Sequence, residues 1–258
     1  MEVSAAATDS TSRDPARVAV VTGGGRGIGA AIAHRLAADG FAVAVNYSAS
    51  EGPARQVAEE ITASGGRATA IRADVSDPTQ AAYLIEQATA EFGAPTVLVN
   101  NAGMNLFGSA RQLSPRDWDR VIGVNLSGAF YCTHAALPAM YEKGWGRVVF
   151  VSSPSGGRRP SPGMSAYAAA KAGLAGMTRA MAQELARRGV TVNAVMPGFV
   201  ETDIIASGGS DAARTLAEHW PRIPAESVAA TVSFLVSDAG QHVSGEEVGV
   251  WLGGPVGI

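Results

Sequence analysis

Cysteine is almost absent from this chain of 258 residues, which contains only Cys132. A single cysteine excludes an intrachain disulfide and a zinc site built from cysteines. Basic charge is not in excess either: 20 Lys and Arg stand against 23 Asp and Glu, so we expect no extended nucleic-acid surface. His34, His134 and His242 lack metal-ligand spacing with acidic or cysteine partners, and we expect no required metal.

The sequence also lacks a secretory signal and a clear membrane span. Residues 1–16 are small and polar, without the apolar stretch of a signal peptide, and we expect them to form a disordered leader. The longest segment without a formal charge, residues 121–141, is interrupted by polar residues and by Pro138. These interruptions favour a buried helix over a membrane span. We therefore expect a cytoplasmic protein with no membrane contact.

Short apolar runs alternate with longer helical stretches from residue 17 onward. This alternation, in a chain that is 47% apolar and 17% charged, predicts one α/β domain: a doubly wound parallel sheet of about seven strands, with helices on both faces. The predicted strands are Val18–Val21, Phe41–Asn46, Ala68–Arg72, Thr96–Asn100, Gly146–Val151, Val190–Val195 and one near Val248–Trp251. The predicted helices are Ile28–Asp39, Pro53–Ser64, Thr79–Phe92, a long one ending near Tyr141, Ala166–Arg187 and Ala225–Ser237.

A glycine-rich turn, Thr-Gly-Gly-Gly-Arg-Gly-Ile-Gly at residues 22–29, follows the first predicted strand. Such a turn lets backbone N–H groups and the positive end of a helix meet a pyrophosphate. Side chains at Gly23, Gly27 or Gly29 would block this approach or hold the helix off the sheet. A tight turn without a ligand is the alternative, and the position after the first strand favours dinucleotide binding.

The end of the second predicted strand indicates which dinucleotide the site prefers. A site selective for NAD carries Asp or Glu there to hold the ribose 2′-hydroxyl, whereas this strand ends in Asn46, Tyr47 and Ser48. Arg26, inside the glycine turn, has a guanidinium that suits a 2′-phosphate. The sequence therefore predicts that NADP(H) is preferred over NAD(H).

Tyr167 and Lys171 are spaced to share one face of a helix. Tyrosine has a pKa near 10, and a neighbouring ammonium lowers that pKa by stabilising the phenolate. The spacing therefore predicts an acid–base catalyst, with an ordinary surface pair as the alternative.

The motifs together resemble those of the short-chain dehydrogenase/reductase family, most closely its 3-oxoacyl-[acyl-carrier-protein] reductase group. The resemblance runs from Arg17 to about Gly254 and is carried, in the family's order, by residues 22–29, Asp74-Val75, Asn100-Asn101-Ala102-Gly103, Asn125, Ser152-Ser153, Tyr167 with Lys171, and Pro197-Gly198. It implies a single NAD(P)-binding Rossmann catalytic domain over residues 17–258.

The resemblance implies four catalytic residues. Tyr167 would exchange a proton with the substrate oxygen, and Lys171 would lower its pKa and bind the nicotinamide ribose. Ser153 would hydrogen-bond the carbonyl oxygen, and Asn125 would hold a relay water. The residues expected to bind the cofactor, from the turn, the second strand and the resemblance together, are Gly23, Arg26, Gly27, Ile28, Gly29, Asn46, Tyr47, Ser48, Asp74, Val75, Asn100, Ala102, Gly103, Tyr167, Lys171, Pro197, Gly198, Val200 and Thr202.

The chain departs from the family pattern near the substrate. Ser153 lies one residue farther from Tyr167 than is usual, which leaves Ser152, Ser155 and Ser161 as rivals and adds a residue near Arg158 and Arg159. Leu252-Gly253-Gly254 replaces the usual Asp-Gly-Gly, and residues 203–222 are expected to form a lid. Met104, Phe107 and Met164 are candidate pocket residues.

The sequence thus predicts an NADP(H)-dependent oxidoreductase for a small-molecule carbonyl or secondary alcohol, such as a 3-oxoacyl-type ketone. The alternatives are an NAD-dependent sugar or secondary-alcohol dehydrogenase, and a cofactor-binding regulator without catalysis. The resemblance further implies a homotetramer or homodimer formed by the helices at Arg116–Tyr141 and Ala166–Arg187.

Overall fold

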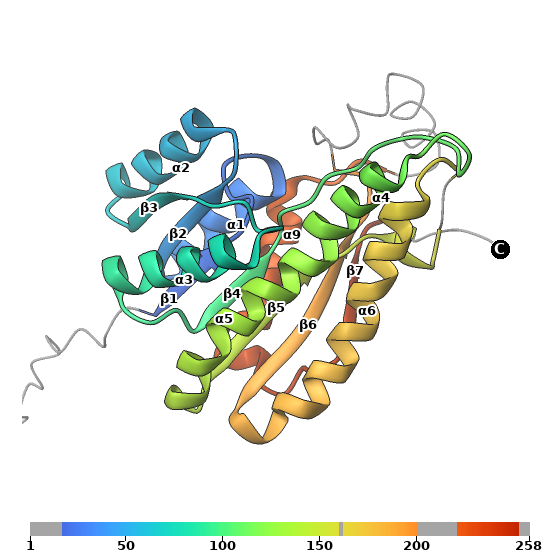
Figure 1. Cartoon of the computed structure of the whole chain (residues 1–258). Helices are drawn as coiled ribbons and strands as arrows, with labels where there is room; N and C mark the ends of the chain where they lie inside the picture. The colour runs from blue at the N-terminus through green and yellow to red at the C-terminus, as the bar shows by residue number, and fades with distance from the viewer. Residues whose placement is uncertain (1–16, 160–161, 201–220, 253–258) are drawn as a thin grey trace, which may run out of the picture.

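The computed structural model describes residues 17–159, 162–200 and 221–252, and its centre is a parallel sheet of seven strands (Figure 1). The strand order is β3-β2-β1-β4-β5-β6-β7, and every neighbouring pair is parallel. The strands are β1 Val18–Val21, β2 Ala42–Tyr47, β3 Arg67–Arg72, β4 Val97–Asn100, β5 Gly146–Val151, β6 Val190–Pro197 and β7 Glu247–Val250. The predicted doubly wound parallel sheet is therefore confirmed.

Helices cover both faces of the sheet (Figure 1). They are α1 Gly27–Ala38, α2 Glu51–Ala63, α3 Pro78–Phe92, α4 Pro115–Ile122, α5 Gly128–Lys143, α6 Ser165–Leu185 and α9 Ala225–Val236. The long helix predicted to end near Tyr141 is interrupted: a π-helical turn, Gly123–Ser127, joins α4 to α5. No helix within the described ranges has the length and apolarity needed to cross a membrane.

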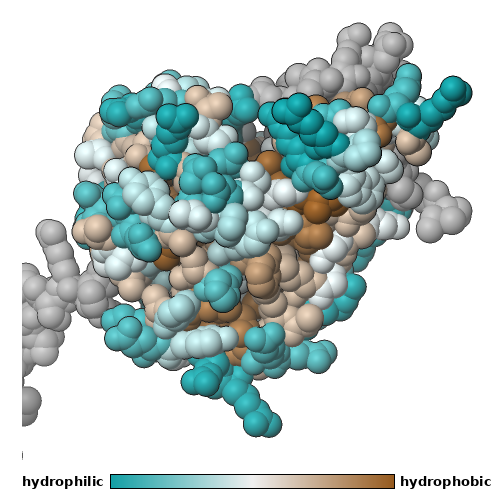
Figure 2. All heavy atoms as spheres, in the orientation of Figure 1, coloured by the Kyte–Doolittle hydropathy of each residue, from teal (hydrophilic) through white to brown (hydrophobic). Residues whose placement is uncertain are grey.

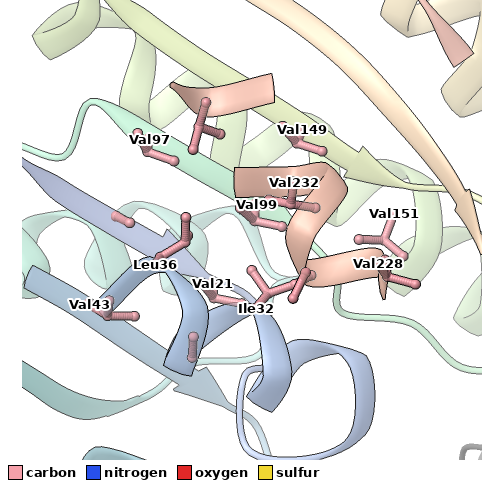
Figure 3. Packing of buried hydrophobic residues seen from close by; sticks show 14 of the residues in the cluster. Val21, Ile32, Leu36, Val43, Val97, Val99, Val149, Val151, Val228 and Val232 are labelled. Carbon is pink, nitrogen blue, oxygen red and sulfur yellow. The ribbon is translucent and has the colours of Figure 1, made fainter. Parts of the chain in front are cut away.

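Two hydrophobic layers hold the helices to the sheet, because successive strand residues point to opposite faces. Val97 and Val99 pack on one face with α1, α2 and α9, as Figure 3 shows for the α1 and α9 side. Leu98, between them, packs on the other face with α3, α5 and α6. Cys132 of α5 is buried in this second layer, as predicted for a small apolar side chain.

The strand order places a crevice at the middle of the carboxyl edge of the sheet. β1 pairs with β2 on one side and with β4 on the other, so the connections that leave β1 and β4 diverge from neighbouring points. In open α/β sheets, ligands bind outside the carboxyl ends of the strands at such a reversal of order. The segments that follow β5 and β6 leave from the same edge because all strands are parallel.

The glycine turn occupies this point between β1 and α1. Gly23 has φ of +61°, a left-handed conformation that glycine adopts without steric cost. A Cβ at Gly29, in the first turn of α1, would collide with the carbonyl oxygen of Gly23. The helix can therefore begin directly against the turn only because residue 29 has no side chain.

We expect Gly29→Ala to lower the free energy of unfolding by about 1–3 kcal/mol, because the backbone must shift to admit the methyl group. The matched control is Gly52→Ala, in the first turn of α2, where an added Cβ would meet no atom within 4 Å. This control should leave stability unchanged or raise it by as much as about 1 kcal/mol. Urea denaturation measures both, and equal effects of the two substitutions would contradict the packing argument.

Candidate active site

Hydrogen bonds fasten the glycine turn to the end of β4. The Thr22 hydroxyl oxygen accepts from the backbone N–H groups of Asn101 and Ala102, each at 2.9 Å. The Asn101 side-chain amide donates to the carbonyl oxygens of Thr22 (2.9 Å) and Gly23 (3.0 Å). The two connections that flank the crevice are thereby held in fixed relative positions.

Asn46, at the end of β2, holds the turn from the other side. Its Oδ1 accepts from the Gly23 N–H at 3.2 Å, and its Nδ2 donates to Ala73 O at 3.0 Å. Nδ2 also lies within hydrogen-bond distance of Ile71 O and Tyr47 O. The buried side chain is therefore engaged with the protein's own backbone, which makes it a support for the turn.

The π-helical turn after α4 orients Asn125. Its Nδ2 donates to Met104 O at 2.7 Å and to Val121 O at 2.8 Å, and its Oδ1 accepts from the Met104 N–H at 3.3 Å. The amide thus pairs with both backbone polar groups of Met104, which lies in the segment after β4. The predicted role in holding a relay water stays a prediction, and the observed contacts show that Asn125 fixes this segment.

Tyr167 and Lys171 lie one turn apart on α6 and are both buried, with 8% and 4% of their surface exposed. This burial argues against the alternative of a surface pair. The Lys171 Nζ lies 5.4 Å from the centre of the Tyr167 ring and donates to Val151 O, at the end of β5, at 2.8 Å. The ammonium is therefore tied to the sheet beside the aromatic ring.

The serines after β5 have different partners, and these partners distinguish Ser153 from the alternative candidates for the serine beside Tyr167. The Ser153 side chain lies beside the Tyr167 phenol, where it opposes the rise in the tyrosine pKa, and its Oγ accepts from the Ser155 N–H at 3.2 Å. The Ser152 hydroxyl donates to Lys171 O at 3.3 Å. Ser161 lies outside the described residues. Ser153 is thus the serine whose hydroxyl meets the tyrosine.

Burial shifts the pKa values of the tyrosine and the lysine in opposite directions. It raises the pKa of Tyr167 to about 12, and the hydrogen bond from Ser153 opposes this shift. It lowers the pKa of Lys171 to about 8. The sequence predicted a lowered tyrosine pKa. In this structure that prediction is wrong, because desolvation of the phenolate outweighs the effect of its neighbours.

The crevice has the features that a dinucleotide requires. The glycine turn presents backbone where side chains would obstruct a pyrophosphate, and a Cβ at Gly103 would lie 2.9 Å from Asn125 Oδ1 and 3.7 Å from Lys171 Nζ. The buried Asn100 Oδ1 has no hydrogen-bond partner, although its Nδ2 donates to Thr133 at 3.1 Å. Asn100 lines a narrow recess together with Thr22, Val75, Ala102, Val124, Gly128 and Ala129. An unsatisfied acceptor at this edge of the sheet fits the ribose hydroxyls of NAD(P).

Two arginines lie near the expected position of the 2′-phosphate. Arg26 is exposed at the N-cap of α1, at the end of the glycine turn. Arg72, which the sequence reasoning missed, ends β3 and donates from Nε to Ser48 O at 3.3 Å. Arg72 can be placed near the end of β2 only when the pairing of the strands is known, because β3 lies beside β2 and Arg72 is in register with Tyr47.

The remaining predicted cofactor residues lie along the same edge. Asp74 is exposed and accepts from the Ser76 N–H and hydroxyl, and Val75 is buried. Gly198 follows Pro197 at the end of β6 and donates its N–H to Val250 O at 2.9 Å. Val200 is buried in the core cluster of α1 and α9. Thr202 and nearly all of the predicted lid lie outside the described residues.

The predicted pocket residues lie on two segments that meet beside α6. The Gly108 N–H donates to Gly163 O at 3.0 Å, which joins the segment after β4 to the segment before α6. Met164 packs against the cluster of Tyr167 with Ala166 and Val121, and Phe107 is 42% exposed. In the loop after β5, the Arg158 guanidinium lies 5.8 Å from the centre of the Trp251 ring, just beyond β7.

Thr22 and Asn101 are further residues that the sequence reasoning left without a role. They lie within the recognised motifs, but their contacts depend on β1 and β4 being neighbours. Among residues 17–159, 162–200 and 221–252, no group of three or more His, Cys, Asp or Glu side chains is placed to hold a metal ion.

Comparison with known proteins identifies the family. Residues 17–213 match the family model described as short chain dehydrogenase. The chain is 39% identical over 235 residues to the 3-oxoacyl-[acyl-carrier-protein] reductase FabG of Staphylococcus aureus, covering 90% of this chain and 95% of that protein. It is 40% identical over 236 residues to the 3-oxoacyl-[acyl-carrier-protein] reductase of a Synechocystis species, covering 91% and 95%.

Solved structures agree with this assignment. A blue fluorescent protein from a metagenomic library, in complex with NADPH, has a TM-score of 0.85 and 38% identity, covering 91% of this chain and 96% of that one. A mutant of a Serratia marcescens short-chain dehydrogenase/reductase has a TM-score of 0.84 and 35% identity, covering 92% and 98%. The chain therefore belongs to the short chain dehydrogenase family, and it is an NAD(P)-dependent oxidoreductase that acts on CH–OH and C=O groups.

Proposed function

We propose that the protein is an NADP(H)-dependent reductase of ketones, with 3-oxoacyl-type compounds as the favoured substrate class. The observation that carries this proposal is the buried group of Tyr167, Ser153 and Lys171 at the carboxyl edge of the sheet, beside the glycine turn. The relatives named as 3-oxoacyl-[acyl-carrier-protein] reductases support the substrate class.

Tyr167 is the proton donor in this proposal. With its pKa raised to about 12, the phenol keeps its proton throughout the neutral range and can give it to a substrate oxygen as negative charge develops there. Ser153 donates a hydrogen bond to the same oxygen. Bound nicotinamide supplies the hydride that reduces the carbonyl carbon.

Lys171 and Asn125 support the tyrosine in different ways. Lys171 is buried next to Gly103, and in this proposal its ammonium binds the hydroxyls of the nicotinamide ribose. Asn125 holds Met104 and with it the segment that borders the substrate. Both residues thus keep cofactor and substrate in position for the proton donor.

The preference for NADP(H) rests on charge at the ends of β2 and β3. No carboxylate follows β2, where the chain continues from Tyr47 to Ser48, and Arg26 and Arg72 flank this position. A guanidinium pairs well with a phosphate group, and each pair strengthens binding of the phosphorylated cofactor alone. The known structure in complex with NADPH is consistent with this preference.

Two other functions differ from this proposal in measurable ways. An NAD-dependent sugar or secondary-alcohol dehydrogenase would prefer the unphosphorylated cofactor and the oxidative direction. A regulator without catalysis would bind the cofactor and turn over no carbonyl. The buried contact between Ser153 and Tyr167 favours a catalyst, because a regulator has no need of a buried phenol with a hydrogen-bond donor beside it.

We also propose that the protein assembles as a homodimer or homotetramer through α5 and α6. Figure 2 shows apolar surface over α5 and toward its border with α6. Phe130 of α5 is 44% exposed and stacks on His134, with ring centres 6.0 Å apart. Gly176 of α6 has no side chain and faces open space, so another helix can approach it closely.

We expect Tyr167→Phe to lower the rate of ketone reduction by about 10²-fold to 10⁴-fold, because it removes the proton donor. NADPH binding should be retained. The control is Tyr83→Phe, which removes the hydroxyl of an exposed tyrosine on α3. Loss of NADPH absorbance in the presence of β-keto esters and diketones measures the rate. A Tyr167→Phe protein as active as the control would refute the catalytic assignment.

We expect Arg26→Ala and Arg72→Ala each to weaken NADPH binding by about tenfold, because each removes one charge-assisted hydrogen bond. NADH binding should change little, since it has no 2′-phosphate. Arg187→Ala serves as the control for lost charge, because Arg187 lies at the opposite edge of the sheet before β6. Fluorescence titration with both cofactors measures the affinities, and an equal loss for NADPH and NADH would contradict the 2′-phosphate role.

A further inference from the structure

Asn105, in the segment that connects β4 to α4, is buried, and its side-chain amide has no hydrogen-bond partner in the part of the chain that the structure describes. Only 7% of the residue is exposed, and neither Nδ2 nor Oδ1 has a partner. A buried amide gives up its hydrogen bonds to water, so native proteins nearly always replace them. A buried side chain with no partner at all therefore needs an explanation.

The other buried asparagines show how this fold treats the amide group when it serves structure. Asn46 and Asn125 use both polar atoms in contacts with the backbone. Asn193 of β6 does the same: its Nδ2 donates to Val243 O at 2.8 Å, and its Oδ1 accepts from the Glu246 N–H at 3.2 Å. Asn105 differs from all three, since within the described ranges its side chain contributes no hydrogen bond to the fold.

The segment that carries Asn105 runs along the catalytic residues. On one side, the backbone of Met104 is paired with the Asn125 amide. On the other side, Leu106 packs against the cluster that contains Tyr167. The long connection between β4 and α4, green in Figure 1, is held again by the bond from Gly108 to Gly163. Asn105 is thus fixed between two anchors that both belong to the active site.

We propose that Asn105 is a specificity-determining residue, whose amide hydrogen-bonds a second oxygen of the ketone substrate, close to the reacting carbonyl. This inference rests on the proposed reduction of ketones. An ester or thioester carbonyl oxygen accepts from Nδ2, whereas a hydroxyl group can also donate to Oδ1. The substrate class is therefore a ketone with an oxygen function at the β position, and a simple ketone lacks the group that Asn105 binds.

Because the amide of Asn105 is unpaired within the described ranges, the effect of replacing it on substrate specificity can be measured apart from its effect on stability. Because the Asn105 amide has no partner among the described residues, replacing it with the similarly sized Leu removes an unsatisfied polar group and costs that part of the fold no hydrogen bond. The same replacement at Asn193 removes a side chain whose two polar atoms are both paired. Asn105→Leu and Asn193→Leu therefore form a matched pair.

The test compares three ketones with NADPH as reductant: 2-butanone, ethyl acetoacetate and 4-hydroxy-2-butanone. We expect Asn105→Leu to lower kcat/KM by about tenfold or more for the substrates with a second oxygen, and to leave 2-butanone nearly unchanged. A larger loss for the keto ester assigns the partner as a carbonyl oxygen, and a larger loss for the hydroxyketone assigns it as a hydroxyl. The melting temperature of Asn105→Leu should equal or exceed that of the wild type, whereas Asn193→Leu should melt lower.

Two outcomes would overturn the inference. One is an unchanged ratio of kcat/KM between oxygenated and simple ketones in Asn105→Leu. The other is a fall in melting temperature as large as that of Asn193→Leu, which would show that the amide has a structural partner. Failure of the proposed function itself looks different: the wild-type protein would then reduce none of the three ketones, so the proposal for Asn105 would fall with it.

Discussion

The joint between the glycine turn and the end of β4 is the constraint on which the rest of the site depends. Thr22 and Asn101 tie the first connection of the fold to the fourth strand through hydrogen bonds of 2.9 to 3.0 Å. These bonds exist only because the strand order brings β1 and β4 together. They fix the distance between the backbone of the glycine turn and the segment that leads to Met104 and Asn105.

Asn125 holds the same segment after β4 from another side. This residue sits in a π-helical turn, where its amide takes hold of the Met104 backbone. Lys171 and Tyr167 approach from α6 and are tied to the end of β5 through Val151 and Ser153. Three separate elements thus converge on one point, and burial there keeps the tyrosine protonated and shifts the pKa of the lysine to about 8.

Sequence patterns predicted the elements well because strand and helix periods are local properties. The position of the glycine turn after β1 and the common helix face of Tyr167 and Lys171 were also predictable, because both follow from spacing along the chain. The interruption of the helix at Gly123–Ser127 was not, because a π-helical turn leaves no periodic signal in a run without charges. Arg72, Thr22 and Asn101 act through strand pairing, and the unpaired amide of Asn105 is recognisable only when every hydrogen bond around it is known.

We propose that this crevice brings the nicotinamide of NADPH and a ketone together beside Tyr167. The most direct measurement uses NADPH deuterated at the transferable position, with ethyl acetoacetate as substrate and mass spectrometry of the product. We expect a hydroxy ester that carries one deuterium on the carbinol carbon. A protein that binds this cofactor tightly but forms no labelled alcohol from any β-keto ester would contradict it.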